Sequence, residues 1–312
     1  MRLAVSISLG SPSRDYRVLV SPPGGPRVEL RRIGTGGDLG RAAALMRDYD
    51  GRADAIGLGG VNLAFCIGRR RWAFPAGQYL LSQARRTPVI DGAGFKEAIE
   101  PDIVRELAQS HGVSFAGTTA LVTSVLDRYP LAHALSQAGA FVLAGDPLFA
   151  LRVPLALPLG AFAAAATLTM PALRHLPLRF LYPWGDELRG RGERRAPWWL
   201  AAWVRRAQVV AGDFHLLARF GRLDLGGKVV IASALDDADV AWLFDCGAAL
   251  VATATPRLER CSPAANAIEA LLACIGLPPA AGGRPAGLRR AWRELGLQPY
   301  VERRPRGGAG VG

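Results

Sequence analysis

The feature that most constrains the fold of this chain is an internal repeat. Residues 120–147 read ALVTSVLDRYPLAHALSQAGAFVLAGDP, and residues 229–256 read VVIASALDDADVAWLFDCGAALVATATP. Each copy begins with an apolar run, continues with Ser-x-Leu-Asp and an amphipathic pattern that ends at Gly-Ala, and closes with a second apolar run. A strand that is apolar along its whole length is buried on both faces, as in a parallel sheet covered by helices. The repeat therefore predicts two βαβ units of one doubly wound sheet.

The expected architecture is an α/β protein with a Rossmann-like doubly wound parallel sheet and a smaller N-terminal α/β part. Two further strands are expected beside the repeat, at 88–90 and 208–210. Apolar runs and Pro/Gly turns predict N-terminal strands at 3–9, 16–20, 28–33 and 53–58, with a helix over 38–48. The expected parts are an N-terminal part (1–87), a Rossmann-like domain (88–277) with an inserted lid (147–207), and a largely disordered tail (278–312). Within the tail, a short amphipathic helix is expected over 288–295.

The chain has 312 residues and a net charge of +12, which raises the question of a nucleic-acid partner. Nearly all of the positive charge is arginine, because lysine occurs only at Lys96 and Lys228. The arginines are scattered, and only the stretch 189–206 combines several of them with three tryptophans. Nucleic-acid-binding proteins usually gather basic residues on one face. An ordinary solvated surface is therefore favoured, and we expect no nucleic-acid partner.

Residues 153–173 form an uncharged stretch that is nearly long enough to span a bilayer. Pro154, Pro158 and Pro171 interrupt it and arginines flank both ends, so we expect a protein-buried or lid-like helix and no membrane contact. The four cysteines show no CxxC spacing, and together with four scattered histidines they indicate no metal site. Such cysteines are typical of a reducing compartment, and we expect a cytoplasmic protein.

Acidic residues follow several predicted strands at the points where the strands end. Asp91, Asp146 and Asp213 come directly after buried runs, with Lys96 and His215 close by in the sequence. The carboxyl ends of parallel strands meet at one edge of a sheet, where ligands of such folds bind. We therefore expect these five residues to surround one cleft, in which His215 and the carboxylates can act as acid–base groups. The alternative is that the aspartates only cap helices or form turns.

A glycine-rich loop, GTGGDLG at 34–40, opens the predicted N-terminal helix. Its backbone amides can hold a phosphate at a helix start. Asp38 opposes this because its carboxylate repels an anion, and a tight turn with Asp38 as the helix cap is the alternative. The chain has no P-loop and no G-x-S-x-G motif, which argues against those classes of enzyme.

Several segments make the chain similar to a known bacterial family. They are SISLGSPSRDYRV, RRIGTGGDLGRA, DAIGLGG, TPVIDGAG, LDR, AGDPLFAL, LYPWG, AGDFH and the ATATP…NAIEALL ending, and they cover most of the chain before its tail. In these segments the chain resembles a family that carries the label quinate 5-dehydrogenase. The resemblance implies an oxidoreductase that uses NAD or NADP and acts on a cyclic hydroxy acid such as quinate or shikimate.

In this interpretation, Lys96 and Asp91 handle the proton of the substrate hydroxyl, with Asp213 and His215 as further catalytic candidates. The cofactor would meet residues that follow the two strands of the first repeat copy, namely Ser124, Asp127, Arg128, Gly145 and Asp146.

The turn after the first strand of the repeat departs from the pattern of dinucleotide-binding enzymes. It reads TSVLD over 123–127 and lacks the glycines that let a pyrophosphate approach the backbone. The alternative function is a non-catalytic Rossmann-like protein that binds a small anionic metabolite or a nucleotide. Both interpretations predict a small-molecule ligand, and the sequence leaves the oligomeric state open.

Overall fold

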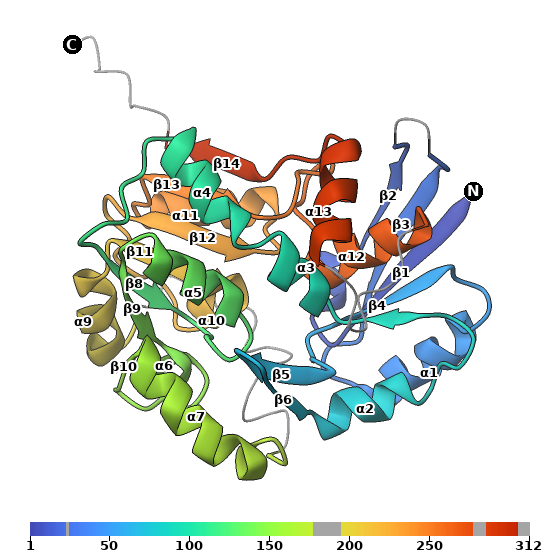
Figure 1. Ribbon diagram of the computed structural model, residues 1–312, viewed down its shortest axis with the longest axis horizontal. Coiled ribbons are helices and arrows are strands. Elements are labelled where there is room, and N and C mark those ends of the chain that lie inside the picture. The colour runs from blue at the N-terminus through green and yellow to red at the C-terminus, as the bar shows by residue number, and fades with distance from the viewer. Residues whose placement is uncertain (23–24, 177–194, 277–284, 305–312) are drawn as a thin grey trace.

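The computed structural model describes residues 1–22, 25–176, 195–276 and 285–304. In these residues, two sheets lie side by side and form the two lobes of the molecule (Figure 1). The strands of the first lobe are β1 (Arg2–Ser8), β2 (Tyr16–Val20), β3 (Val28–Gly34), β4 (Ala55–Gly59) and β7 (Val89–Ile90). Their order is β2-β3-β1-β4-β7, with β2 antiparallel to β3 and the other neighbours parallel.

The second lobe is built on a larger sheet. Its strands are β8 (Thr119–Val122), β9 (Phe141–Ala144), β10 (Leu157–Pro158), β11 (Val209–Asp213), β12 (Val229–Ser233), β13 (Leu250–Thr253) and β14 (Tyr300–Arg303). Their order is β10-β9-β8-β11-β12-β13-β14, with β10 and β14 as antiparallel edges of a parallel centre. The chain order reverses between β8 and β11, which makes this pair the topological switch point of the sheet.

Both copies of the internal repeat form βαβ units in this second sheet, as the sequence predicts. The first copy is β8, α5 (Tyr129–Gln137) and β9, and the second is β12, α11 (Asp237–Asp245) and β13. Gly139 and Gly247 follow the two helices with φ of +91° and +99°, a left-handed conformation that glycine adopts without strain.

The remaining elements are η1 (Pro12–Arg14), α1 (Leu39–Tyr49), the hairpin β5 (Ala64–Ile67) and β6 (Arg70–Ala73), α2 (Pro75–Leu81), α3 (Ala93–Ala98), α4 (Asp102–Gln109), α6 (Asp146–Phe149), α7 (Leu159–Leu173), α9 (Trp198–Arg206), α10 (Phe214–Ala218), α12 (Ala265–Cys274) and α13 (Pro285–Glu294).

The chain returns to the first lobe after β13, because α12 packs against β1, β3, β4 and β7. The packing is close enough to need glycine at position 57, where a Cβ atom would lie 2.7 Å from the backbone oxygen of Asn266. The Asn266 amide also donates to Ser6 Oγ at 2.7 Å. One continuous apolar core includes strands of both sheets together with α3, α12 and α13. The two lobes are therefore not independent consecutive domains.

The strand expected at 88–90 is present as β7, but its predicted place was wrong. It pairs with β4 in the first sheet and does not join the repeat strands. A two-residue strand has no pattern that reveals its neighbour. The strand expected at 208–210 is β11, which lies between β8 and β12 as predicted.

Residues 153–173 were expected to form a protein-buried or lid-like helix, and the prediction of burial was wrong for most of the segment. Within α7, only a stripe of Phe162, Ala166 and Met170 is buried, and Leu168 is 81% exposed. The i, i+4 spacing buries one face, and the Ala-rich remainder faces outward without a charged residue to mark it. No helix in the described ranges is both long and apolar enough to cross a membrane. Residues 177–194, which hold most of the polar middle of the expected lid, lie outside the described residues.

The short helix expected over 288–295 is confirmed as α13, but the expectation that the tail is largely disordered needs correction for β14, which pairs with β13. Trp292 of α13 is buried and meets Phe95 edge-on, with ring centroids 5.4 Å apart. This apolar contact holds α13 against α3. The ranges 277–284 and 305–312 lie outside the described residues.

Candidate functional site

The carboxyl ends of the parallel strands of both sheets meet at one cleft. The cleft has a volume of about 130 Å³ and lies between the two lobes. Its lining includes polar side chains from both lobes: Ser6, Ser8, Arg14, Arg32, Asn62 and Asp91 from the first, and Asp127, Arg128, Asp213, His215 and Ser233 from the second, with Lys96 and Asn266 from the connecting helices. This is the edge at which open α/β sheets bind ligands.

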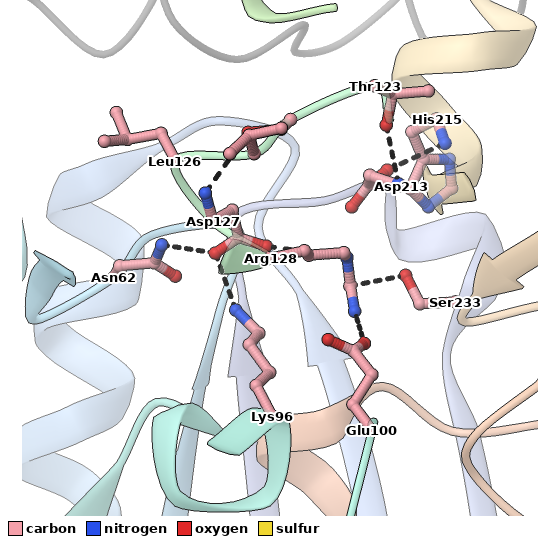
Figure 2. A network of polar contacts seen from close by, with 12 residues as sticks. Asn62, Lys96, Glu100, Thr123, Leu126, Asp127, Arg128, Asp213, His215 and Ser233 are labelled. Atoms are coloured by element: carbon pink, nitrogen blue, oxygen red, sulfur yellow. Dashed lines mark hydrogen bonds and ion pairs between the residues drawn. The ribbon is translucent and has the colours of Figure 1, made fainter. Parts of the chain in front are cut away.

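A lysine–aspartate pair joins the lobes at the centre of the network in Figure 2. Lys96 Nζ lies 2.6 Å from Asp127 Oδ1, and the amide nitrogen of Asn62 donates to the same oxygen at 2.5 Å. The side chains of Lys96 and Asp127 are only 11% and 9% exposed. Lys96 comes from α3, Asn62 from the loop after β4, and Asp127 from the turn after β8. Three distant parts of the chain thus converge on one carboxylate.

The charge of Asp127 is held in place by its neighbours. Burial acts to raise the pKa of Asp127, but Lys96 and Arg128 outweigh it and lower the pKa to about 2. Asp127 therefore remains ionised at neutral pH, and Lys96 lies against a permanent negative charge.

Arg128 connects Asp127 to two further side chains, those of Glu100 and Ser233. Its guanidinium pairs with Glu100, donates to Ser233 Oγ at 2.6 Å, and places Nε 3.7 Å from Asp127 Oδ2. Burial opposes the charged guanidinium, but Glu100 and Asp127 outweigh it and raise the pKa of Arg128. Burial raises the pKa of Glu100, against the pull of Arg128. Within the described residues, Glu100 Oε2 has no hydrogen-bond partner. Arg128 is thus a buried member of a cross-linked network.

Asp213 and His215 also line the cleft, at the end of β11. The Asp213 carboxylate accepts the backbone N–H of His215 at 2.8 Å and caps α10. The backbone N–H of Asp213 donates to Thr123 Oγ1 at 2.8 Å (Figure 2). Asp213 therefore has the capping role that the sequence left open as an alternative, while its side chain still borders the cleft.

Two arginines line the cleft that sequence reasoning did not single out. Arg14 from η1 donates to the carbonyl of Ala234 and lies 2.6 Å from Asp239 Oδ2, so it bridges the lobes. Arg32 from β3 contacts Asp15 and Ser8 Oγ, at 2.8 and 3.1 Å. A charged residue within a buried strand, as at Arg32, is the sequence signal that could have identified this residue as part of the cleft.

Asp146 does not border the cleft, in contrast to the prediction. Its carboxylate accepts the backbone N–H groups of Val125 and Leu126 at 2.8 and 3.0 Å, and Ser124 Oγ lies 3.4 Å away. Burial raises the pKa of Asp146 to about 6, although the hydrogen bonds from the two backbone amides act in the opposite direction. The residue closes the turn after β8, so its position after a strand reflects a structural role.

The predicted cofactor residues do not fit a dinucleotide. In the usual mode, the pyrophosphate approaches the backbone at the turn after the first strand. Here the Asp146 carboxylate already accepts hydrogen bonds from two backbone amides of that turn, those of Val125 and Leu126. A Cβ atom at Gly145 would lie 2.7 Å from the Phe149 ring, so Gly145 serves internal packing. Ser124 contacts Asp146, while Asp127 and Arg128 belong to the buried ion-pair network.

The glycine-rich loop at 34–40 is a tight turn. Gly36 and Gly37 donate their N–H groups to the carbonyls of Gly10 and Leu9, at 2.9 and 2.7 Å. The Asp38 side chain caps α1 by accepting the N–H of Arg41. These amides are engaged within the protein, and the phosphate interpretation of the loop is not supported.

Four of the five residues expected around one cleft are therefore found there: Asp91, Lys96, Asp213 and His215. The expected pairing of Lys96 with Asp91 was wrong, because Asp127 is the partner of Lys96. Asp91 accepts the N–H groups of Leu63 and Ala93, at 2.8 and 3.1 Å.

Two family models match the chain. Residues 94–304 match "Domain of unknown function (DUF8754)", and residues 3–91 match "Domain of unknown function (DUF8753)". The chain belongs to the DUF8754 family. The two matched ranges meet just after β7, where the chain leaves the sheet of the first lobe. Neither description names an activity, so the quinate label is not supported by them. Among curated proteins, no match is found.

Several solved structures are similar to this member of the DUF8754 family. A hetero-hexameric glutamate dehydrogenase from Thermus thermophilus has a TM-score of 0.41 at 12% identity, covering 95% of this chain and 73% of its own. An NAD-dependent malic enzyme from Thermotoga maritima has a TM-score of 0.33 at 12% identity, covering 95% and 85%. The methylenetetrahydrofolate dehydrogenase-cyclohydrolase of Trypanosoma brucei, complexed with NADP and an inhibitor, has a TM-score of 0.31 at 12% identity, covering 94% and 86%. The first and third of these are named dehydrogenases, and the similarity assigns no activity, substrate or cofactor to this chain.

Proposed function

We propose that this protein is an oxidoreductase for a small polyhydroxylated carboxylic acid of the quinate or shikimate kind, which binds in the cleft between the lobes. The observation that carries the proposal is the Lys96–Asp127 pair, which lines the cleft with a cation held against an ionised carboxylate. Interconversion of an alcohol and a carbonyl requires a proton to be accepted or donated at the substrate oxygen.

The pair suits this proton transfer. Asp127 stays ionised because its pKa is about 2, so its carboxylate holds Lys96 Nζ in position at 2.6 Å. When hydride from a nicotinamide reduces the substrate carbonyl, the Lys96 ammonium donates a proton to the developing alkoxide and becomes an amine. In the reverse direction, this amine accepts the proton of the hydroxyl group while the hydride passes to the oxidised nicotinamide. Asn62, which shares the same carboxylate oxygen, restricts the position of Asp127.

The remainder of the cleft suits a ligand with several polar groups. Hydroxyl, amide and guanidinium groups line it, and an engineered cavity of about 150 Å³ in another protein is large enough for a benzene ring. The observed 130 Å³ is therefore of the size of one six-membered ring. Arg32 extends from β3 and Asp91 follows β7, and these two strands are three strand spacings apart, about 14 Å. A carboxylate near the arginines and a hydroxyl at Lys96 match this arrangement.

A second candidate is a non-catalytic protein that binds such a metabolite without converting it. The observation that favours it is Asp146, which occupies amides at the turn where a pyrophosphate would bind. The two candidates share the cleft and differ in whether turnover follows binding.

The test combines binding and turnover on matched variants. Quinate and shikimate are expected to raise the melting temperature of the wild-type protein, because a ligand of the native state stabilises it. With NAD or NADP present, turnover is followed by the absorbance of the reduced nicotinamide. Lys96→Met and Asp127→Asn are expected to lose turnover. Lys228→Met is the control, because Lys228 is the other lysine and bonds to the carbonyl of Ala207 away from the cleft.

Binding without turnover in the wild-type protein would favour the non-catalytic candidate. Absence of any stabilisation by either acid, with folded protein confirmed by circular dichroism, would contradict both candidates.

A further inference from the structure

A second and larger cavity reaches the Lys96–Asp127 pair from another side. This groove has a volume of about 530 Å³ and shares four wall residues with the cleft: Asn62, Asp91, Lys96 and Asp127. A buried ion pair that borders two cavities can contact two different ligands. The volume lies within the range of about 300–1,000 Å³ that is usual for ligand sites.

Apart from the four shared residues, the groove is lined by residues that do not line the cleft. Hairpin strand β5 forms one wall through Ala64 and Cys66, and one side of α5 forms another along the length of the helix. The α5 wall consists of Tyr129, Pro130, His133, Ala134 and Gln137, and α3 and α13 add Ala93, Glu97 and Arg289. The groove is thus a separate site that is connected to the cleft through the ion pair.

The chemistry of the groove suits a planar ring with polar edges. The Tyr129 and His133 rings lie with centroids 6.0 Å apart at an interplanar angle of 33°, and they offer ring surface along one wall. Apolar Ala64, Ala93 and Leu126 add further contact area, while Gln137 and Arg289 provide hydrogen-bond donors. The wall thus combines ring and alkyl surface with charged and polar side chains, and polar groups at fixed positions orient a bound ligand.

The positions where a second reactant would otherwise bind are filled. The amides of the turn after β8 are held by Asp146, and the cleft has room for about one ring. The groove, in contrast, remains open beside the same ion pair.

We propose that the groove binds a nucleotide-type ligand with a planar heteroaromatic ring, of the nicotinamide class, whose ring lies along Tyr129 and His133 near Lys96 and Asp127. The inference rests on the proposed function, because an oxidoreductase needs a second reactant to supply or accept the hydride. It differs from the usual dinucleotide mode, because the turn after β8 takes no part in it.

The experiment measures binding of NAD, NADP and nicotinamide mononucleotide by calorimetry, separately from binding of shikimate. His133→Trp fills the groove, and Ser136→Trp on the same helix is the matched control, because Ser136 is exposed and does not line the groove. His133→Trp is expected to weaken binding of the best nicotinamide probe by at least roughly tenfold, or about 1.4 kcal/mol. Ser136→Trp is expected to leave it unchanged, and neither variant is expected to alter shikimate binding. Gln137→Trp is a second groove-filling variant in case His133→Trp does not fold.

Equal affinity of the nicotinamide probe for wild-type protein and both groove-filling variants would overturn the proposal. Failure of all three probes to bind the wild-type protein would overturn it as well. Shikimate binding in the same samples distinguishes the two proposals, because it depends on the cleft and not on the groove.

Discussion

Asp127 is the residue on which the contacts between the lobes converge. Its Oδ1 atom receives both Lys96 and Asn62, and its Oδ2 atom faces Arg128. Two cations close to this buried carboxylate keep it ionised despite the cost of burial. Such a pattern is expected for a carboxylate that positions a functional side chain, here that of Lys96. Ion pairs of purely structural proteins show the same pattern, so the position of the pair in a cleft gives it functional weight.

Single residues of the site were only partly accessible to sequence reasoning. Lys96 was singled out correctly as a cleft residue, but it was paired with Asp91, five positions away, because sequence reasoning favours local partners. Its actual partner follows a strand of the other sheet. Asp127 itself was expected at the cofactor. The assignment required the relative placement of the two lobes, which no local pattern contains.

The titration of Asp146 gives a prediction at this scale. Burial raises the pKa of this carboxyl group in the folded protein to about 6, above its usual value of about 3.9. The folded state therefore binds the proton more tightly than the unfolded state does. As a result, the contribution of Asp146 to the free energy of unfolding falls as pH rises from about 4 to 6, and is constant above that range.

This titration can be followed at the amides that Asp146 accepts. The backbone N–H resonances of Val125 and Leu126 are expected to shift with a midpoint near pH 6, because the carboxylate that accepts them gains a proton there. In Asp146→Asn the transition should vanish, which provides the control. A midpoint near pH 4 in the wild-type protein would show that burial does not dominate at this carboxyl group.

At the scale of elements, the repeat was the strongest signal, and the two βαβ units that it predicted are present in one sheet. Their acidic residues have diverged in role. Asp236 caps α11 and forms a capping box with Asp239, whereas α5 begins at Arg128 without a side-chain cap. The matching residue Asp127 is thereby available for Lys96. The repeat predicts the strand–helix–strand unit in both copies. The site uses Asp127, whose role differs from that of the matching residue Asp236 in the second copy.

The Arg128–Glu100 pair links α5 to the segment between α3 and α4, and it supplies a prediction about these elements. Arg128→Ala is expected to lower the free energy of unfolding by about 3–5 kcal/mol, because it leaves the Glu100 carboxylate buried without a partner. The double variant Arg128→Met with Glu100→Gln should recover a large part of this loss, since it removes both charges. Urea unfolding measures both effects. A loss below about 1 kcal/mol for Arg128→Ala would indicate that the pair is hydrated, as surface pairs are.

At the scale of the whole molecule, the lobes are interleaved along the chain. The sequence predicted an N-terminal part that ends near residue 87, but the first sheet also includes β7, which lies beyond that boundary. The helix that covers this sheet, however, is α12, which follows all the parallel strands of the second lobe. The sequence of an apolar helix does not show which of two sheets the helix packs against. The arrangement of the lobes was therefore beyond the reach of sequence reasoning.

This interleaving predicts that residues 1–91 do not fold alone. Without α12, strands β1 and β4 lose the cover over one face, and Ser6 loses its partner Asn266. The isolated fragment is expected to aggregate or to show no cooperative thermal transition by circular dichroism, whereas the full chain shows one. A stable, soluble fragment with dispersed amide resonances would contradict the structural dependence on α12.

We propose above that the cleft between the lobes binds a hydroxylated acid at the Lys96–Asp127 pair. A crystal structure of this 312-residue chain with shikimate or quinate would show whether it does. We expect the ring in the cleft, with one hydroxyl oxygen within hydrogen-bond distance, about 3 Å, of Lys96 Nζ and the carboxylate towards Arg14 and Arg32. A ligand bound elsewhere, or a cleft without ligand at saturating concentrations of both acids, would contradict it.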